Sequence, residues 1–147
     1  MIDKELKRIG DMLNQFYNLE LYLNRLITKY FNPEKEVEFF NIMLNTSITS
    51  FGAKVKIISN VVEVDKIIIE NLHELGRIRN GIAHVAPHLV LVNKGDKKTL
   101  TSKISIMKGN GEIVLKDFWE WSKRFDELLD IVVPIIKNKT NSINKEL

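Results

Sequence analysis

One segment of this 147-residue chain carries side chains suited to chemistry on a phosphate ester. Residues 74–87, ELGRIRNGIAHVAP, contain Arg77, Arg79, Asn80 and His84 in an otherwise apolar helical pattern. Histidine accepts and donates protons near neutral pH, and arginine offers a fixed fork of donors to a phosphate whose charge grows in the transition state. RNA supplies its own nucleophile, the 2′-hydroxyl. These residues therefore predict cleavage without a metal or cofactor, leaving a 2′,3′-cyclic phosphate and a 5′-hydroxyl end.

Helical spacing divides these side chains between two faces. At about 100° per residue, His73, Arg77, Asn80 and His84 follow steps of four, three and four and share one face. Arg79 instead continues the apolar stripe of the helix, at a position that suits leucine. That stripe consists of Ile68, Leu72, Leu75 and Ile82. A guanidinium in such a seam needs an acidic partner, an anionic ligand or a wet interface.

Glu20 is the obvious acidic partner for Arg79. It interrupts the apolar stripe of the first predicted helix between Phe16 and Leu23, where a hydrophobic residue is due. Two roles remain open for it, a structural ion pair with Arg79 and support of catalysis.

Two histidines also have simpler interpretations. His84 lies at the expected C-terminal end of its helix, where the helix dipole stabilises a cation without any catalysis. His73 shares only a helical face with the other site residues, so it is either a supporting RNA-binding residue or an ordinary surface residue.

The elements that must position these residues are mostly helical. Apolar residues at alternating steps of three and four predict a long first helix that ends before Asn32-Pro33. Asp65 is a plausible N-cap for the helix that carries the motif, and Pro87 should stop that helix. The helices expected in this part of the chain span residues 4–31, 34–45, 48 or 51 to 62, and 66–85.

The chain then changes character. Short β-branched runs separated by Gly, Asn and Asp predict two hairpins or a three-stranded antiparallel meander at about residues 88–115. Asp117 with Glu120 predicts the start of a final helix, residues 118–138, which Pro134 should kink or end. We therefore expect an all-α bundle of four or five helices with a small β insertion, forming one domain over residues 1–138, and a polar tail at 139–147.

The string Arg79-Asn80-Gly81-Ile82-Ala83-His84 resembles the signature of the HEPN domain family. That signature is an arginine, then a polar residue, and a histidine after a total gap of four to six residues. SFGAKVKIISNVV followed by ENLHELGRIRNGIAH is also similar to the third-helix and motif-helix pattern of these domains. The resemblance covers roughly residues 1–86 and the last helix, and leaves out the β insertion.

Membership would imply a helical bundle that forms a homodimer, with a composite cleft where two motifs meet across the dimer axis. It would also imply metal-independent endoribonuclease activity, often in toxin–antitoxin or phage-defence settings. Carried over to this chain, the resemblance implies that Arg79 stabilises the phosphate, that Asn80 has an orienting role, and that His84 acts as acid or base or positions the scissile group. Arg77 has a permitted spacing to His84, but Ile78 follows it where the family prefers a polar residue, so we expect Arg77 as a second cation.

Composition limits the possible classes of protein. The net charge of +3 permits an anionic partner such as RNA, but the basic residues are spread along the chain. Lys94, Lys97 and Lys98 are expected at a hairpin tip, where lysines are usually solvated. The absence of cysteine excludes a disulfide scaffold, a thiolate zinc site and a cysteine nucleophile. With no apolar signal core or membrane span in the sequence, we expect a cytoplasmic protein.

Three functions remain in competition. The first is a HEPN-type ribonuclease that cuts RNA under the control of an antitoxin or nucleotidyltransferase partner protein. The second is a non-catalytic module of the same fold that binds nucleotide or RNA or serves for dimerisation. The third is an interaction module whose hairpins bind a partner by strand addition, with Arg79 and His84 structural.

Overall fold

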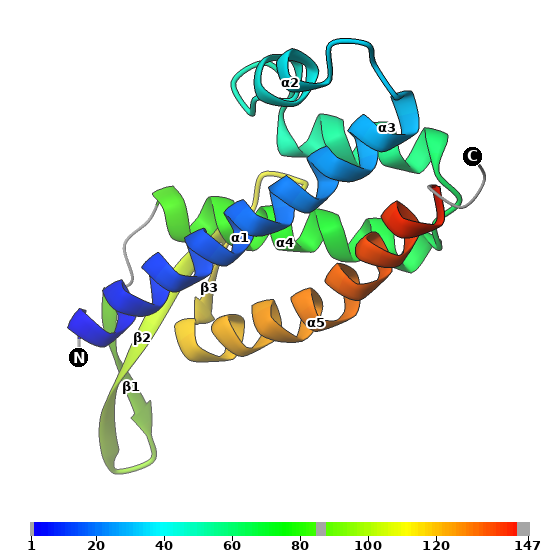
Figure 1. The fold of residues 1–147 in the computed structure, drawn as a ribbon. Coiled ribbons are helices and arrows are strands. Elements are labelled where there is room, and N and C mark those ends of the chain that lie inside the picture. Colours follow the sequence, from blue (N-terminus) through cyan, green and yellow to red (C-terminus); the bar gives the residue numbers. More distant parts are fainter. Residues whose placement is uncertain (1, 85–87, 144–147) are drawn as a thin grey trace. The chain divides into compact units, whose positions relative to one another are not determined.

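The computed structural model describes residues 2–84 and 88–143. Helices make up most of these residues, and an antiparallel sheet precedes the last helix, so the predicted helical fold with a β insertion is confirmed (Figure 1). In chain order the elements are α1 (Ile2–Phe31), α2 (Glu36–Glu38), the π-helical turn η1 (Phe39–Met43), α3 (Phe51–Val61), α4 (Lys66–His84), β1 (His88–Lys94), β2 (Lys97–Met107), β3 (Ile113–Asp117) and α5 (Phe118–Ile143).

The chain divides into two compact units. Unit 1 consists of Met1–Gln15 and Arg77–Glu127, and unit 2 consists of Phe16–Gly76 and Leu128–Leu147. The motif segment from Arg77 to His84 therefore belongs to unit 1, whereas Glu20 and His73 belong to unit 2.

The sheet of unit 1 forms a meander in the order β1-β2-β3, with Leu91 opposite Leu100 and Ser105 opposite Leu115. Side chains alternate between the two faces of a strand, and in β2 Ser102, Ile104 and Ile106 are the buried ones. The motif helix packs closely on this strand. A Cβ at Gly81 would lie 3.4 Å from both Ile106 Cγ1 and the Ser105 carbonyl oxygen, which shows that α4 lies against β2 at this residue.

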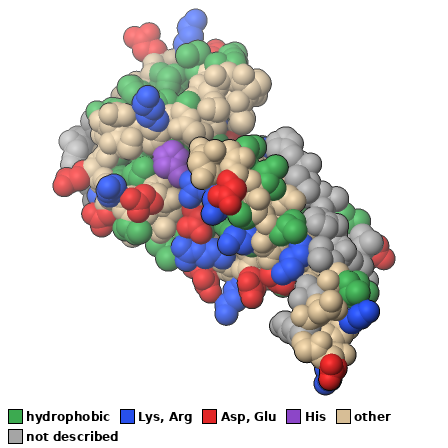
Figure 2. All heavy atoms as spheres, turned by 180° about the vertical axis from the view of Figure 1, so that it is seen from behind, with side chains coloured by type: hydrophobic (Ala, Val, Ile, Leu, Met, Phe, Trp, Pro, Cys, Tyr) green, Lys and Arg blue, Asp and Glu red, His purple; other side chains and the backbone are tan. Residues whose placement is uncertain are grey.

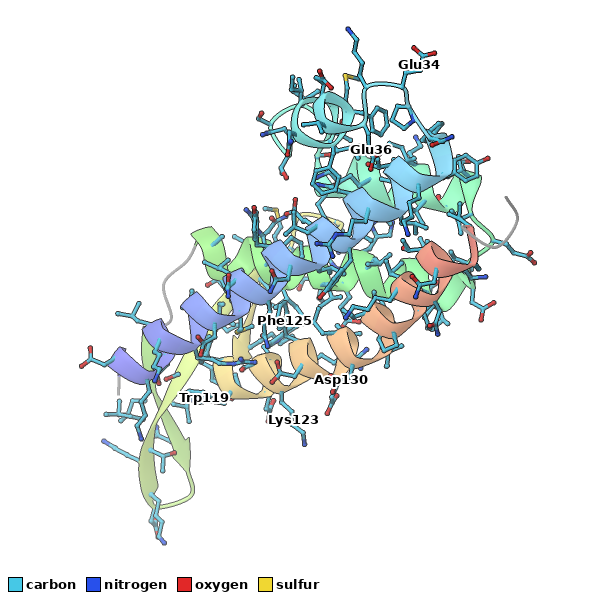
Figure 3. The ribbon with its side chains drawn as sticks, viewed as in Figure 1. Glu34, Glu36, Trp119, Lys123, Phe125 and Asp130 are labelled. Carbon is cyan, nitrogen blue, oxygen red and sulfur yellow. The ribbon has the colours of Figure 1, made fainter. Side chains whose placement is uncertain are left out.

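The start of α5 is held by polar contacts within unit 1. Asp117 Oδ1 accepts hydrogen bonds from the backbone N–H of Trp119 at 3.0 Å and of Glu120 at 3.1 Å, which confirms the predicted N-cap. Arg8 of α1 donates to Ser122 Oγ at 2.5 Å and pairs with Asp126 at 2.6 Å. Figure 3 shows Phe125 and Lys123 on opposite sides of α5; Phe125 is buried and Lys123 is exposed.

Helix α3 in unit 2 begins where its sequence supplies a cap. The Ser50 side chain accepts a hydrogen bond from the backbone N–H of Ala53 at 3.2 Å, and the predicted third helix follows. The buried apolar residues of unit 2 are Phe16, Leu19, Leu23, Leu26, Ile27, Leu44, Val55, Ile58, Ile68, Leu72, Leu75, Leu128, Leu129, Val132 and Ile136.

The prediction of a regular second helix over residues 34–45 is wrong. The structure has a short α2 followed by η1, and Leu44 N–H bonds to the carbonyl of Phe39, five residues back, at 3.0 Å. The apolar residues Val37, Phe40, Ile42 and Leu44 follow steps of three, two and two, which do not lie on one α-helical face. Val37 and Ile42 are accordingly exposed, and Leu44 is buried.

Helix α5 does not end at Pro134. It continues to Ile143, so residues 139–143 of the expected polar tail are helical. Pro134 is exposed, while Val132 and Ile136 on either side of it are fully buried. The burial of these two side chains stabilises the helix at Pro134, although proline lacks the backbone N–H that would donate a helical hydrogen bond. The stop expected at Pro87 lies outside the described residues.

Candidate functional site

Arg79 and Asn80 form the centre of the candidate site on α4. Arg79 is half-buried, and its Nη1 donates a hydrogen bond to the amide oxygen of Asn80 at 3.2 Å. This contact restrains the guanidinium of Arg79 on the helix surface. The exposed Asn80 amide and the partly exposed Arg79 are both accessible to a ligand.

The placement of Arg79 in the apolar seam is wrong. The seam runs through Leu75, Ile78 and Ile82, and Ile78 is fully buried. From Leu75 the buried stripe continues three residues on to Ile78 and then four residues on to Ile82. The expected stripe instead went four residues on to Arg79 and then three to Ile82. Arg79 consequently lies at the flank of the seam, where its charge does not have to be desolvated completely.

The residues expected to share one face of α4 are exposed wherever the structure describes their side chains. In unit 1, Arg77 and Asn80 are exposed, so two arginines and an amide lie within one helical turn. His84 is the last residue of α4, four residues beyond Asn80, and its side chain lies outside what the structure describes. His73 is exposed in unit 2, as expected.

Glu20 is paired with Lys54, a different cation from the expected Arg79. Its Oε2 lies 3.4 Å from Nζ of the fully buried Lys54 and accepts a hydrogen bond from Thr46 Oγ1 at 2.5 Å. Burial lowers the pKa of the Lys54 ammonium, and the Glu20 carboxylate opposes this shift. Lys54, in place of Arg79, is thus the cation that explains an acidic residue within the apolar stripe of α1.

The sequence does contain a signal for Lys54. It directly precedes Val55 in the inward-facing pattern of α3, at a step of four from Ile58. A lysine at such a position, with a glutamate in the stripe of another helix, indicates a buried ion pair.

Unit 1 contains a second buried carboxylate that sequence reasoning missed. Glu5 of α1 is 3 % exposed, and its Oε1 accepts a hydrogen bond from Ser102 Oγ of β2 at 2.5 Å. This hydrogen bond lowers the pKa of the Glu5 carboxyl, while desolvation acts against it. The contact joins α1 to β2, the strand on which the motif helix packs, and so helps to fix the position of that strand.

Two further properties bear on the class of site. Among the side chains that the structure describes, which do not include those of His84 and His88, no cluster of three His, Asp or Glu is placed to hold a metal ion. Within residues 2–84 and 88–143, each helix falls short of the length and apolarity that a membrane crossing requires.

Comparisons with known proteins add no relative. No family model, curated protein or solved structure matches the chain. The resemblance to HEPN domains accordingly depends on the motif residues and their place on a helix.

Proposed function

We propose that the chain is a metal-independent HEPN-type endoribonuclease that acts as a homodimer, with Arg79, Asn80 and His84 as its catalytic residues. The observation that carries this proposal is the Arg79–Asn80 hydrogen bond beside the exposed Arg77 on α4. It gives a restrained guanidinium, a second cation and an amide within one turn, on the helix that ends at His84. Such a surface suits a phosphodiester, whose charge increases during cleavage.

In the proposed reaction the imidazole of His84 removes the proton from the ribose 2′-hydroxyl. The 2′-oxygen then forms a bond to phosphorus, and the bond from phosphorus to the 5′-oxygen breaks. The leaving oxygen takes up a proton, and the products are a 2′,3′-cyclic phosphate and a 5′-hydroxyl. Arg79 stabilises the charge on the phosphate oxygens, and Asn80 keeps the guanidinium oriented.

A homodimer suits this reaction because it requires both a proton acceptor and a proton donor. Each chain supplies one motif histidine, and two motifs at a two-fold axis supply two imidazoles and four guanidinium groups. An enzyme that cuts RNA also endangers its own cell, so control by an antitoxin or a nucleotidyltransferase partner forms part of the proposal.

The experiment is cleavage of single-stranded RNA by the purified full chain in EDTA, with His84→Ala and Arg79→Ala beside it. Removing one catalytic group is expected to lower the rate at least 100-fold, as for general acid–base groups and oxyanion donors. Lys123→Ala is the matched control, because Lys123 is exposed on α5 away from the motif (Figure 3).

Cleavage that survives both motif substitutions, or that EDTA abolishes, contradicts the proposal. RNA binding without any cleavage by the unmodified chain would instead indicate the non-catalytic module of the same fold.

A further inference from the structure

Unit 2 contains a basic pocket that the proposed cleavage reaction does not use. Residues of α1 and of the last turns of α5 line it, and it has a volume of about 260 Å³. Its lining consists of Tyr22, Arg25, Lys29, Lys137, Thr140 and Asn141. Three of these side chains are cations, and none is a carboxylate.

Helical spacing brings the pocket residues together. Tyr22, Arg25 and Lys29 follow steps of three and four on α1, so they share one face of that helix. Lys137 and Asn141 are four residues apart on α5 and likewise share a face. The two helices thus contribute cations from opposite sides of the pocket.

The ring of Tyr22 holds two of the cations. Lys137 Nζ lies 4.6 Å from the ring centroid and Arg25 Cζ lies 5.7 Å from it, both within the range of a cation–π interaction. The negative face of the ring offsets part of the repulsion between the two positive groups. An anion between the cations would offset the rest.

The pocket cations have no carboxylate partners among the described residues. Among the side chains that the structure describes, Arg25, Lys29 and Lys137 take part in none of the ion pairs, which involve other cations such as Arg8 and Lys54. Of the polar lining residues, Thr140 donates its hydroxyl to the Ile136 carbonyl at 2.7 Å, whereas Asn141 is exposed. The pocket therefore presents positive charge and an amide donor to a ligand.

We propose that this pocket binds a linear polyphosphate group of two or three phosphates. Three cations on two helices suit several negative charges spread along a chain better than one charge at a point. A volume of about 260 Å³ is far above the roughly 10–15 Å³ that one water molecule needs on the same measure, so the pocket has room for more than a single small anion. It is also below the roughly 300–1,000 Å³ of pockets that enclose a drug-sized ligand, which favours the phosphate chain over a whole nucleotide.

The test is isothermal titration calorimetry of the full chain with sodium triphosphate, in the absence of RNA. Saturable binding is expected, and Lys137→Gln and Arg25→Gln should each weaken it about tenfold, the effect of losing one charged contact. Lys56→Gln is the matched control, because Lys56 is an exposed lysine on α3 of the same unit outside the pocket, and this variant should bind like the unmodified chain. Both pocket cations are exposed, so the variants are expected to fold, which a thermal melt verifies.

Further ligands identify the source of the phosphates. Sulfate, which has a single tetrahedral group, should bind more weakly than triphosphate. Equal affinity for triphosphate and ATP supports recognition of the phosphate chain itself, whether free or attached to a nucleoside. The proposal is overturned if triphosphate does not saturate the protein, or if Lys56→Gln weakens binding as much as Lys137→Gln does. None of these readouts depends on the cleavage of RNA.

Discussion

At the scale of single residues, the buried ammonium group of Lys54 is held by two polar side chains, Glu20 and Thr46. Lys54 is fully buried, and removing an ammonium from water is costly unless a carboxylate and further hydrogen bonds compensate. Glu20 supplies the carboxylate, and the Thr46 hydroxyl lies 3.4 Å from Lys54 Nζ and bonds to the same carboxylate oxygen. The three side chains form a structural cluster of unit 2.

This cluster predicts a large effect of Glu20→Ala. The substitution leaves the Lys54 ammonium buried without its counter-ion, which should lower the free energy of unfolding by roughly 3 kcal/mol. Urea denaturation at pH 7 measures the change. The double variant Glu20→Leu/Lys54→Met should recover most of the stability, because it removes both charges together.

The same double variant tests whether Glu20 also supports catalysis, the second role that its position in the sequence leaves open. A structural Glu20 predicts that the refolded double variant cleaves RNA at the rate of the unmodified chain. A folded double variant with cleavage lost would show that Glu20 acts in the reaction.

A second residue-scale prediction concerns Glu5 and Ser102. Ser102→Ala removes a buried hydrogen bond to a carboxylate, which should cost about 1.5–3 kcal/mol at pH 7. Because this bond lowers the pKa of Glu5, its contribution is present above the pKa of an unfolded glutamate, about 4.3, and is lost as the pH falls through the folded value.

Urea unfolding at a series of pH values between 7 and 3 measures this effect. The difference in stability between the unmodified chain and Ser102→Ala should shrink as the pH falls through the lowered pKa. A difference that stays constant over the series would show that Glu5 is not stabilised in its ionised form.

At the scale of elements, the N-terminus of α5 depends on one carboxylate. Asp117→Ala removes the acceptor of two backbone N–H groups and should lower the free energy of unfolding by about 1 kcal/mol. Asp117→Asn keeps an acceptor oxygen and should cost less. Chemical denaturation compares both with Asp130→Ala, which alters an exposed position inside the same helix (Figure 3) and is expected to change stability by less than about 0.5 kcal/mol.

The sequence predicts the long helices well because their apolar residues repeat at three and four over many turns. Helix α1 was expected over residues 4–31 and runs from Ile2 to Phe31. The region of α2 and η1 has many apolar residues, but their steps of three, two and two fit no single helical face, and the backbone there forms a hydrogen bond from Leu44 N–H to the Phe39 carbonyl, five residues back. At Pro134 the local rule was overridden by the burial of Val132 and Ile136, which a sequence pattern cannot weigh against a lost hydrogen bond.

The candidate site was predictable in part. The exposure of Arg77, Asn80 and His73 follows from helical spacing alone. Whether Ile78 or Arg79 is buried depends on which face of α4 packs against its neighbours. One of these neighbours is β2, which contacts α4 at Gly81, and the pattern of residues within α4 does not predict that contact. Helical spacing marks Glu20 and Lys54 each as a charge in an inward-facing pattern, but their pairing across 34 positions depends on how α1 and α3 pack together.

At the scale of the whole molecule, basic and acidic residues nearly balance, with 22 Lys and Arg against 19 Asp and Glu. At the turn between β1 and β2, Lys97 and Lys98 lie beside the acidic Asp96, and basic and acidic side chains meet at the hairpin tip (Figure 2). The net charge of +3 is modest. RNA recognition is therefore proposed to depend on the local cations of α4 in a dimer.

The dimer proposal predicts that activity depends on protein concentration. As the chain is diluted through its dimer dissociation constant, cleavage per chain should fall in step with the dimer fraction. Sedimentation measures that fraction, and a fluorescent RNA reports cleavage in the same buffer. Constant cleavage per chain across a transition to monomers would show that one copy forms a complete site.

The ends of the RNA products test the central claim most directly. The proposed 2′-hydroxyl attack predicts that mass spectrometry of RNA cut in EDTA finds 2′,3′-cyclic phosphate and 5′-hydroxyl ends. An RNA with a 2′-deoxy sugar at the cleaved position should remain intact, because it lacks the nucleophile. Products with 3′-hydroxyl and 5′-phosphate ends, or cleavage of the 2′-deoxy substrate, would contradict the mechanism assigned to Arg79 and His84.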